Sequence, residues 1–158
     1  MAETTHCKQC SEPMHRQVIG TLSGEDGALK IAVANFPALV CGRGHRQFIT
    51  GDFPIKLLQQ VMKGDNGGLP AGKKQGMLFK KYQCSGCGAA LGSDGAPRAI
   101  GRDVSVAEDA ELHVEMTVPV YTCTSCGREQ LRSSDDIAGH APAALAHLFQ
   151  AANLKPPG

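Results

Sequence analysis

The sequence predicts a small mixed α/β protein stabilised by metal. It would consist of two tandem zinc-ribbon modules, each a β-hairpin with zinc knuckles and each followed by a short helix. The seven cysteines include three Cys-x-x-Cys pairs, a spacing typical of metal sites. Five Phe, two Tyr and no Trp are little material for a large core, and nineteen Gly with nine Pro indicate many turns. A module below about 70 residues then needs further stabilisation, which a bound metal ion can supply.

Disulfides are the competing interpretation of the cysteines. An odd cysteine count, the two-residue gaps and the lack of an apolar N-terminal signal segment favour a reducing compartment and metal ligation instead. No apolar run reaches the ~18 residues that a transmembrane helix needs. We therefore expect a cytoplasmic protein that does not act at a membrane.

The first module is expected over residues 1–63. Strands at 17–22 and 28–34 form its hairpin, with a turn at 23–27, because 28–34 alternates apolar and polar side chains. A helix is expected over 53–62.

Two signals mark this helix. Asp52 can cap it, and Pro54 lies in its first turn, where the missing amide hydrogen costs nothing. Ile55, Leu58 and Met62 recur at helical spacing, which predicts that this face packs back onto the hairpin of the same module.

Residues 64–80 are expected to form a flexible Gly- and Lys-rich linker, because they contain many chain breakers and few apolar side chains. The second module follows over 81–158, with strands at 100–106 and 112–118. A last helix is expected over 142–153. Its apolar stripe, which should pack against its own ribbon, contains Leu145, Leu148, Phe149 and Ala152.

Both modules follow the order knuckle, hairpin, knuckle and helix, which predicts an internal duplication. Residues 36–41 and 118–123 match most closely, each with a proline four residues before the cysteine. Farther on, 46–49 resembles 128–131, and between these matches His45 stands one position later after Cys41 than Cys126 stands after Cys123. The shift predicts that the metal-binding turn of the first module is one residue longer.

Four cysteines of the second module have the spacing of one tetrahedral metal site. Gly88 and Gly127 follow two of them and supply the left-handed residue that such turns favour. The four expected ligands are Cys84, Cys87, Cys123 and Cys126.

The first module offers three cysteines, and Gly44 stands where a fourth would be expected. His45 is the preferred fourth ligand, because imidazole is longer and three cysteines with one histidine are an accepted structural set. His6 and His15 are competing candidates. The expected site contains Cys7, Cys10, Cys41 and His45.

Both sites are expected to hold a structural Zn²⁺ ion, because sites with four protein ligands are closed to substrate. Iron held by thiolates, as in rubredoxin-like electron carriers, is the alternative. No base or nucleophile accompanies His113, His140 and His147, and no phosphate-binding Gly-Lys-Ser/Thr loop is present. The sequence therefore predicts no catalytic residues, no small-molecule substrate and no enzyme.

Charge is unevenly placed along the chain. Residues 82–158 are acidic, which makes the second module a poor nucleic-acid surface. Clustered lysines near the linker can contact phosphates, and they suggest a nucleic-acid-binding accessory factor in transcription or translation as an alternative function. These are Lys73, Lys74, Lys80 and Lys81.

The first module resembles the YgiT-type zinc-finger domain of bacterial antitoxins over residues 7–62. The resemblance rests on Cys7-x-x-Cys10, the thirty-residue gap before Cys41 and the approach at 36–38. It implies a structural zinc and contact with a partner protein. The chain departs from that pattern because His45 replaces the last cysteine and no helix-turn-helix segment follows, so no DNA-reading repressor is implied. We therefore expect a non-catalytic bacterial adaptor or accessory subunit that binds another protein.

Overall fold

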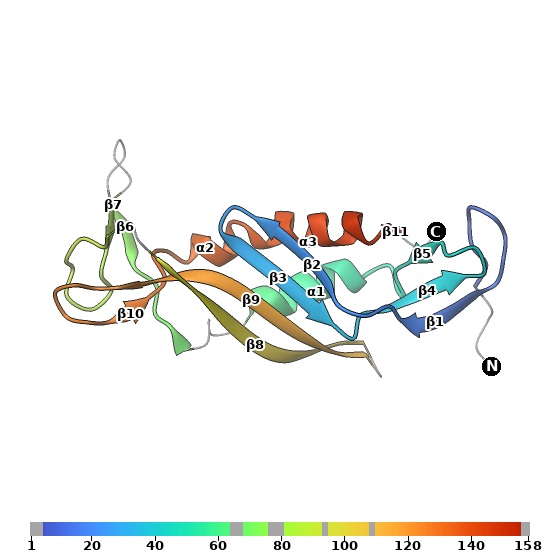
Figure 1. Ribbon diagram of the computed structural model, residues 1–158, viewed down its shortest axis with the longest axis horizontal. Coiled ribbons are helices and arrows are strands. Elements are labelled where there is room, and N and C mark those ends of the chain that lie inside the picture. Colours follow the sequence, from blue (N-terminus) through green and yellow to red (C-terminus); the bar gives the residue numbers. More distant parts are fainter. Residues whose placement is uncertain (1–4, 64–67, 76–80, 93–94, 108–109, 156–158) are drawn as a thin grey trace.

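The structure is a computed structural model that describes residues 5–63, 68–75, 81–92, 95–107 and 110–155. It is an elongated mixed α/β molecule with the metal-binding turns of the two halves at opposite ends (Figure 1). Within the described ranges, no helix is long and apolar enough to cross a membrane.

The first half of the chain forms one long hairpin that bends in its middle. Strand β1 (Met14–Val18) pairs with β4 (Pro37–Cys41), and β2 (Leu22–Asp26) pairs with β3 (Leu29–Ala34). Left-handed backbone allows the bend. The two residues there with positive φ are Gly20 at 98° and Asn35 at 60°.

Strand β2 occupies the segment predicted as a turn, so the turn at 23–27 is wrong. The chain reverses instead at Gly27, where φ is 58°. Gly24 serves a different purpose: a Cβ there would collide with the backbone oxygen of Ala144 in helix α3 (Ala141–Ala151). Glycine at this position lets the helix approach the strand closely.

The second half forms a longer hairpin than predicted. Strands β8 (Ala96–Ala107) and β9 (Ala110–Thr122) pair along nearly their whole length and extend beyond the expected 100–106 and 112–118. The predicted alternation on β9 is confirmed, because its apolar side chains are buried. They are Leu112, Val114, Met116 and Val118.

Part of the predicted linker 64–80 is ordered against the second half. Strand β6 (Lys73–Gln75) pairs with β7 (Lys81–Gln83), and Leu131 exchanges backbone hydrogen bonds with Pro70 and Gly72. Residues 64–67 and 76–80 lie outside the described ranges. The domain boundaries at 63/64 and 80/81 stay a prediction.

Strand β3 pairs with β9, from Lys30 opposite Thr117 to Ala34 opposite His113. The order β2-β3-β9-β8 is therefore one antiparallel sheet built from both halves. Helix α1 (Phe53–Met62) contacts β8 of the second half, whereas α3 contacts β2 and β3 of the first half. The expectation that each helix packs on its own ribbon is wrong for α3 and incomplete for α1, whose Phe53 also contacts Phe36 of the first half. Two tandem ribbons each followed by a helix are not confirmed.

Helix α1 has the predicted range but buries a different face. Phe53, Leu57 and Val61 are buried, while Ile55 is 61% and Met62 is 45% exposed. Both sets recur at helical spacing, so the helix carries two apolar stripes. The sheet covers the stripe that starts at Phe53, and the prediction that the stripe with Ile55 and Met62 packs inward is wrong.

Phenylalanines from both halves form one cluster in the core. Phe149 of α3 lies 4.8 Å from Phe48 and 6.2 Å from Phe36 between ring centroids. Phe53 lies 5.2 Å from Phe36. Edge-to-face contacts of this kind add roughly 0.5–1.5 kcal/mol beyond buried area. The C-terminal helix is therefore packed into the core of the N-terminal half.

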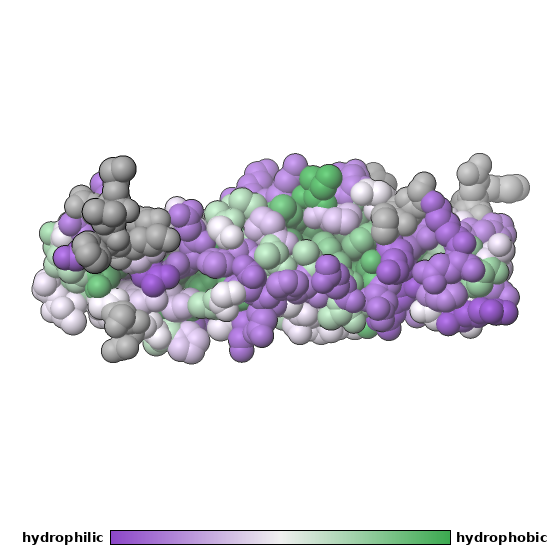
Figure 2. Space-filling model, turned by 90° about the horizontal axis from the view of Figure 1, so that it is seen from above, coloured by the Kyte–Doolittle hydropathy of each residue, from purple (hydrophilic) through white to green (hydrophobic). Residues whose placement is uncertain are grey.

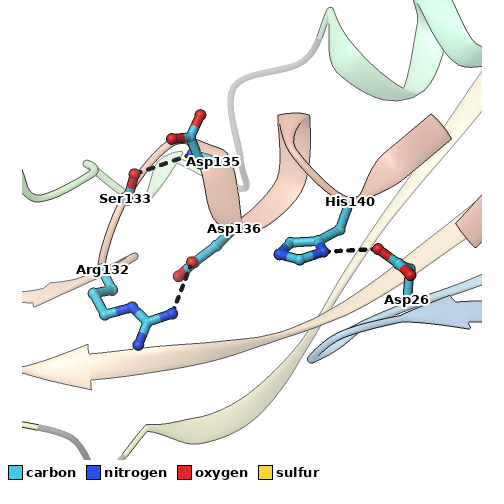
Figure 3. Close-up of polar contacts among 6 residues, drawn as sticks. All are labelled: Asp26, Arg132, Ser133, Asp135, Asp136 and His140. Carbon is cyan, nitrogen blue, oxygen red and sulfur yellow. Dashed lines mark hydrogen bonds and ion pairs between the residues drawn. The ribbon is translucent and has the colours of Figure 1, made fainter. Parts of the chain in front are cut away.

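Two further contacts hold the C-terminal elements there. Strand β11 (Leu154–Lys155) pairs in parallel with β5 (Arg46–Gln47). Just before α3, Nδ1 of His140 lies 2.8 Å from Oδ2 of Asp26 at the end of β2 (Figure 3). Helix α2 (Asp135–Ala138) lies between this pair and the second metal-binding end.

Gly24→Ala tests the close approach of α3 to β2. The added Cβ has to displace helix backbone, so we expect the free energy of unfolding to fall by about 1–3 kcal/mol. Urea denaturation of the metal-loaded protein measures the change. Gly92→Ala is the matched control, because a Cβ at Gly92 meets nothing within 4 Å. Equal stability of the two variants would contradict the close packing.

Candidate metal centres

The structure gathers the expected ligands into two clusters, and within each cluster all ligand atoms lie within 4.8 Å of one another. Each cluster can hold one metal ion. The first contains Cys7, Cys10, Cys41 and His45, and the second contains Cys84, Cys87, Cys123 and Cys126.

The second cluster has the dimensions of a tetrahedral site. The sulfur atoms of Cys84 and Cys126 lie 3.6 Å apart, and those of Cys87 and Cys123 lie 3.5 Å apart. A tetrahedral ion with metal–sulfur bonds of about 2.3 Å needs sulfur atoms about 3.8 Å apart. The four thiols therefore fit one ion with little movement.

Backbone hydrogen bonds shape both turns of this site. The Cys84 N–H donates to the oxygen of Ala89 at 2.7 Å, and the Gly88 N–H donates back to the oxygen of Cys84 at 3.0 Å. Gly127 donates to Cys123 in the same way at 2.8 Å. Gly88 and Gly127 both have φ of 77°, which confirms the predicted left-handed residues.

Gln130 supports this cluster from strand β10 (Glu129–Gln130), and the sequence reasoning missed it. The side chain is fully buried. Its Nε2 donates to the sulfur of Cys84 at 3.1 Å, and its Oε1 accepts the Ser85 N–H at 2.7 Å. The sequence signal is a glutamine shortly after the second knuckle. Its contact with Cys84, 46 residues away, can be recognised only in the folded chain.

The hydrogen bond from Gln130 lowers the pKa of the Cys84 thiol to about 5, helped by backbone N–H groups and opposed by burial. Cys87 behaves oppositely. The Ala89 N–H lowers its pKa, but hydrogen bonds with neighbouring thiols and burial raise it to about 11. The cluster thus holds one readily formed thiolate and one thiol that gives up its proton late, so binding of a dication releases protons.

The first cluster is closed by an imidazole. Nδ1 of His45 lies 3.3 Å from the sulfur of Cys7 and 3.4 Å from that of Cys41, and the sulfurs of Cys10 and Cys41 lie 3.7 Å apart. The competing candidates His6 and His15 are exposed and lie outside this cluster.

The second turn of this site is shorter than its counterpart. The Cys41 N–H donates to the oxygen of His45, whereas the Cys123 N–H donates one residue farther along, to the oxygen of Arg128. The prediction of a longer turn in the first half is therefore wrong.

The shortening explains the histidine. Gly44 has φ of 85° and donates to Cys41 as Gly127 donates to Cys123, so the two glycines correspond. The residue missing from the shorter turn is the one that corresponds to Cys126. The longer side chain of His45 supplies the fourth ligand atom from the next position.

Backbone groups also favour the thiolate at this site. Burial raises the pKa of Cys41, but the N–H groups of Arg43 and His45 lower it more, to about 7. The His45 N–H donates to the sulfur of Cys41 at 3.3 Å. Amide-to-sulfur bonds of this kind stabilise metal-binding thiolates.

Arg132 connects the second metal end to α2. Its guanidinium carbon lies 4.5 Å from the ring centroid of Tyr82, and its Nη2 lies 3.5 Å from Oδ1 of Asp136 (Figure 3). At the same end Arg98 forms an ion pair with Glu129. These contacts neutralise two of its cations.

The other described residues singled out in the sequence belong to neither cluster. Nδ1 of His113 lies 2.9 Å from Asp103, and Nδ1 of His147 lies 2.7 Å from the backbone oxygen of Glu25. Of the four lysines near the linker, Lys73 and Lys81 are exposed, the side chain of Lys74 is not described, and Lys80 lies outside the described residues.

Cys84→Ser should remove the metal from the second cluster alone but loosen both halves, because β9 shares its sheet with β3. We expect metal content to fall from two ions to one per chain, as measured by mass spectrometry under native conditions. Amide exchange should then quicken in β3 as well as β9. Unchanged protection of the whole first half would contradict the shared sheet, and Cys7→Ser provides the reciprocal comparison.

Gln130→Leu should weaken metal binding at the second cluster by about 10–100-fold at neutral pH, as expected when a supporting hydrogen bond is lost. Without the amide donor the pKa of Cys84 rises from about 5 toward its usual value, so the loss should grow as pH falls from 8 to 6. Competition with a chromophoric chelator measures the affinity. Gln150→Leu, at an exposed position on α3, is the matched control, and an equal effect there would refute this role.

No family model, no curated protein and no solved structure matched this chain. The resemblance to the YgiT-type zinc-finger domain stays a prediction.

Proposed function

We propose that this protein is a non-catalytic zinc protein that acts as an adaptor or accessory subunit by binding another protein through the exposed face of α1. The observation that carries this proposal is a second apolar stripe on a helix whose first stripe is already buried.

Zinc is the proposed metal at both sites. Each cluster supplies four protein ligand atoms, and both ligand sets, four cysteines and three cysteines with one histidine, are those of structural zinc sites. Four protein ligands leave no coordination position for a substrate, which supports a structural role. Iron in the second cluster is the alternative, and a colourless protein with two zinc ions per chain would exclude it.

The exposed stripe of α1 lines a shallow hollow. Ile55 and Met62, 61% and 45% exposed, flank the half-buried Leu58. Large apolar side chains gathered on one exposed surface are typical of protein–protein interaction sites. The residues that line the hollow are Ile55, Leu58, Gln59, Met62 and Lys63.

The opposite face of the same helix makes this surface rigid. Phe53 and Leu57 are completely buried, and Val61 is 1% exposed. Nη2 of Arg102 in β8 donates to the backbone oxygen of Val61 at 3.0 Å, which fixes the C-terminal turn against the sheet. A partner therefore meets a preformed surface and loses little affinity to ordering it.

Replacing Ile55 with a photo-crosslinking amino acid should label the partner in the native cell. Binding of that partner, once purified, should fall at least tenfold in Ile55→Glu/Met62→Glu, because each apolar anchor is worth about 1–3 kcal/mol. Ile55→Leu/Met62→Leu should retain binding. Calorimetry measures affinity, and thermal unfolding checks that stability is unchanged.

Two results would contradict the proposal. One is that the glutamate variant binds the crosslinked protein as tightly as the wild type. The other is that the purified, fully metal-loaded protein turns over a substrate while the stripe is substituted.

A further inference from the structure

The end of the molecule that carries the first cluster is strongly basic. Residues 5–18, 37–51 and 152–155 make up this end, and they contain five cations and one carboxylate, Glu12. Three thiolates and one dication would leave a formal charge of −1, too little to offset the excess. This end is predominantly hydrophilic, on the right in Figure 2. The five cations are Lys8, Arg16, Arg43, Arg46 and Lys155.

The strand registers show where these side chains lie. In the sheet β1-β4-β5-β11, Arg16 and Lys155 belong to one row, and His15 and Arg46 belong to the next. Side chains of successive rows point to opposite faces of a sheet. Cations therefore stand on both faces, and Arg46 is held in place because its Nη1 donates to the oxygen of Ala152 at 3.3 Å.

The remaining two cations extend the surface beyond the sheet. Lys8 lies between Cys7 and Cys10, and Arg43 lies in the turn from Cys41 to His45. Both side chains are exposed. Because the two turns enclose the same ligand cluster, Lys8 and Arg43 lie at one tip and join the two basic faces of the sheet.

The opposite end of the molecule is different. There Arg98 is paired with Glu129, and Arg132 is paired with Asp136 and stacked on Tyr82. Residues 68–75, 81–92, 95–98 and 119–136 make up this second end, and they contain six Lys and Arg side chains against three carboxylates. Four thiolates and one dication would add a formal charge of −2 and leave about +1, against about +3 at the end with the first cluster. The end with the first cluster is thus the better polyanion-binding surface among the described residues.

We propose that the basic end binds the phosphate backbone of single-stranded nucleic acid without reading its sequence. A flexible polyphosphate chain can follow cations from one face, over the tip and onto the other face. A planar anionic membrane would reach one face at a time, which disfavours that partner. Phe48 is the one Phe, Tyr or Trp of the described residues at this end, and it is buried, so base stacking does not contribute.

This inference does not depend on the proposed function, because the basic end and the exposed stripe of α1 are separate surfaces. The test uses the full metal-loaded chain and a labelled single-stranded DNA of about 20 nucleotides, a length that exceeds typical single-strand sites. Fluorescence anisotropy measures the affinity from about 50 to 200 mM salt, where binding to phosphates weakens steeply.

Two double variants remove cations from different parts of the surface. Arg16→Gln/Lys155→Gln acts on the sheet face, and Lys8→Gln/Arg43→Gln acts at the tip. Each should lower the slope of log affinity against log salt by about 1.4, because single strands give about 0.7 for each phosphate contact. The sheet-face variant keeps the test valid if substitution at the tip disturbs the metal-binding turns.

The matched control is Lys30→Gln/Lys56→Gln. It removes two exposed cations outside the basic end, where they pair with Glu25 and Asp52, and it should leave the slope unchanged. Three results would overturn the proposal: no binding at about 50 mM salt, an equal loss in the control, or equally strong competition by phosphatidylserine vesicles or polyglutamate. Vesicle competition would assign the surface to membranes, and polyglutamate competition would assign it to an acidic protein.

Discussion

The pairing of β3 with β9 is the interaction on which the rest of the molecule depends. A two-stranded hairpin is at best marginally stable in water, and each half contributes one. Joined through Ala32 and Glu115 at the middle of the shared register, they form a sheet with one face that both helices cover. Each helix packs on strands of the other half, so each half loses part of its cover when the other is lost. The two ligand clusters then lie at the two ends of a structure whose centre both halves share.

Local features of this fold could be predicted from the sequence, and long-range ones could not. Ligand spacing, the left-handed Gly88 and Gly127, and the range of α1 all follow from a few neighbouring residues. The alternation of β9 is the same whichever strand lies beside it, so it does not reveal β3 as the neighbour. In α1 both apolar stripes have helical spacing, and only the position of the sheet decides which is buried. Gly24 looks like a turn residue until α3 is placed against it.

The two clusters show the same division between local and distant information. His45 replaces a cysteine because the turn after Cys41 lacks one residue, and the sequence already shows the histidine at the right distance. Gln130 could not be recognised in this way. Its side-chain amide contacts Cys84 because β10 pairs with β9, and this pairing places Gln130 beside the turn that contains Cys84. The spacing of the cysteines and His45 thus predicts the ligands. Gln130, which lowers the pKa of Cys84, can be identified only from the tertiary fold.

Charge follows the long axis of the molecule rather than the order of the chain. Counted along the sequence, the second half is acidic, and the lysines near the linker are the obvious cations. In space, acidic residues such as Asp103 and Glu115 lie on the central sheet, and two arginines of the second half, Arg98 and Arg132, are paired with carboxylates near its metal end. The larger excess of cations lies at the first metal end, far along the chain from those lysines. A surface for polyanions therefore arises where strands from both termini meet, because β11 brings Lys155 into the sheet that already contains Arg16 and Arg46.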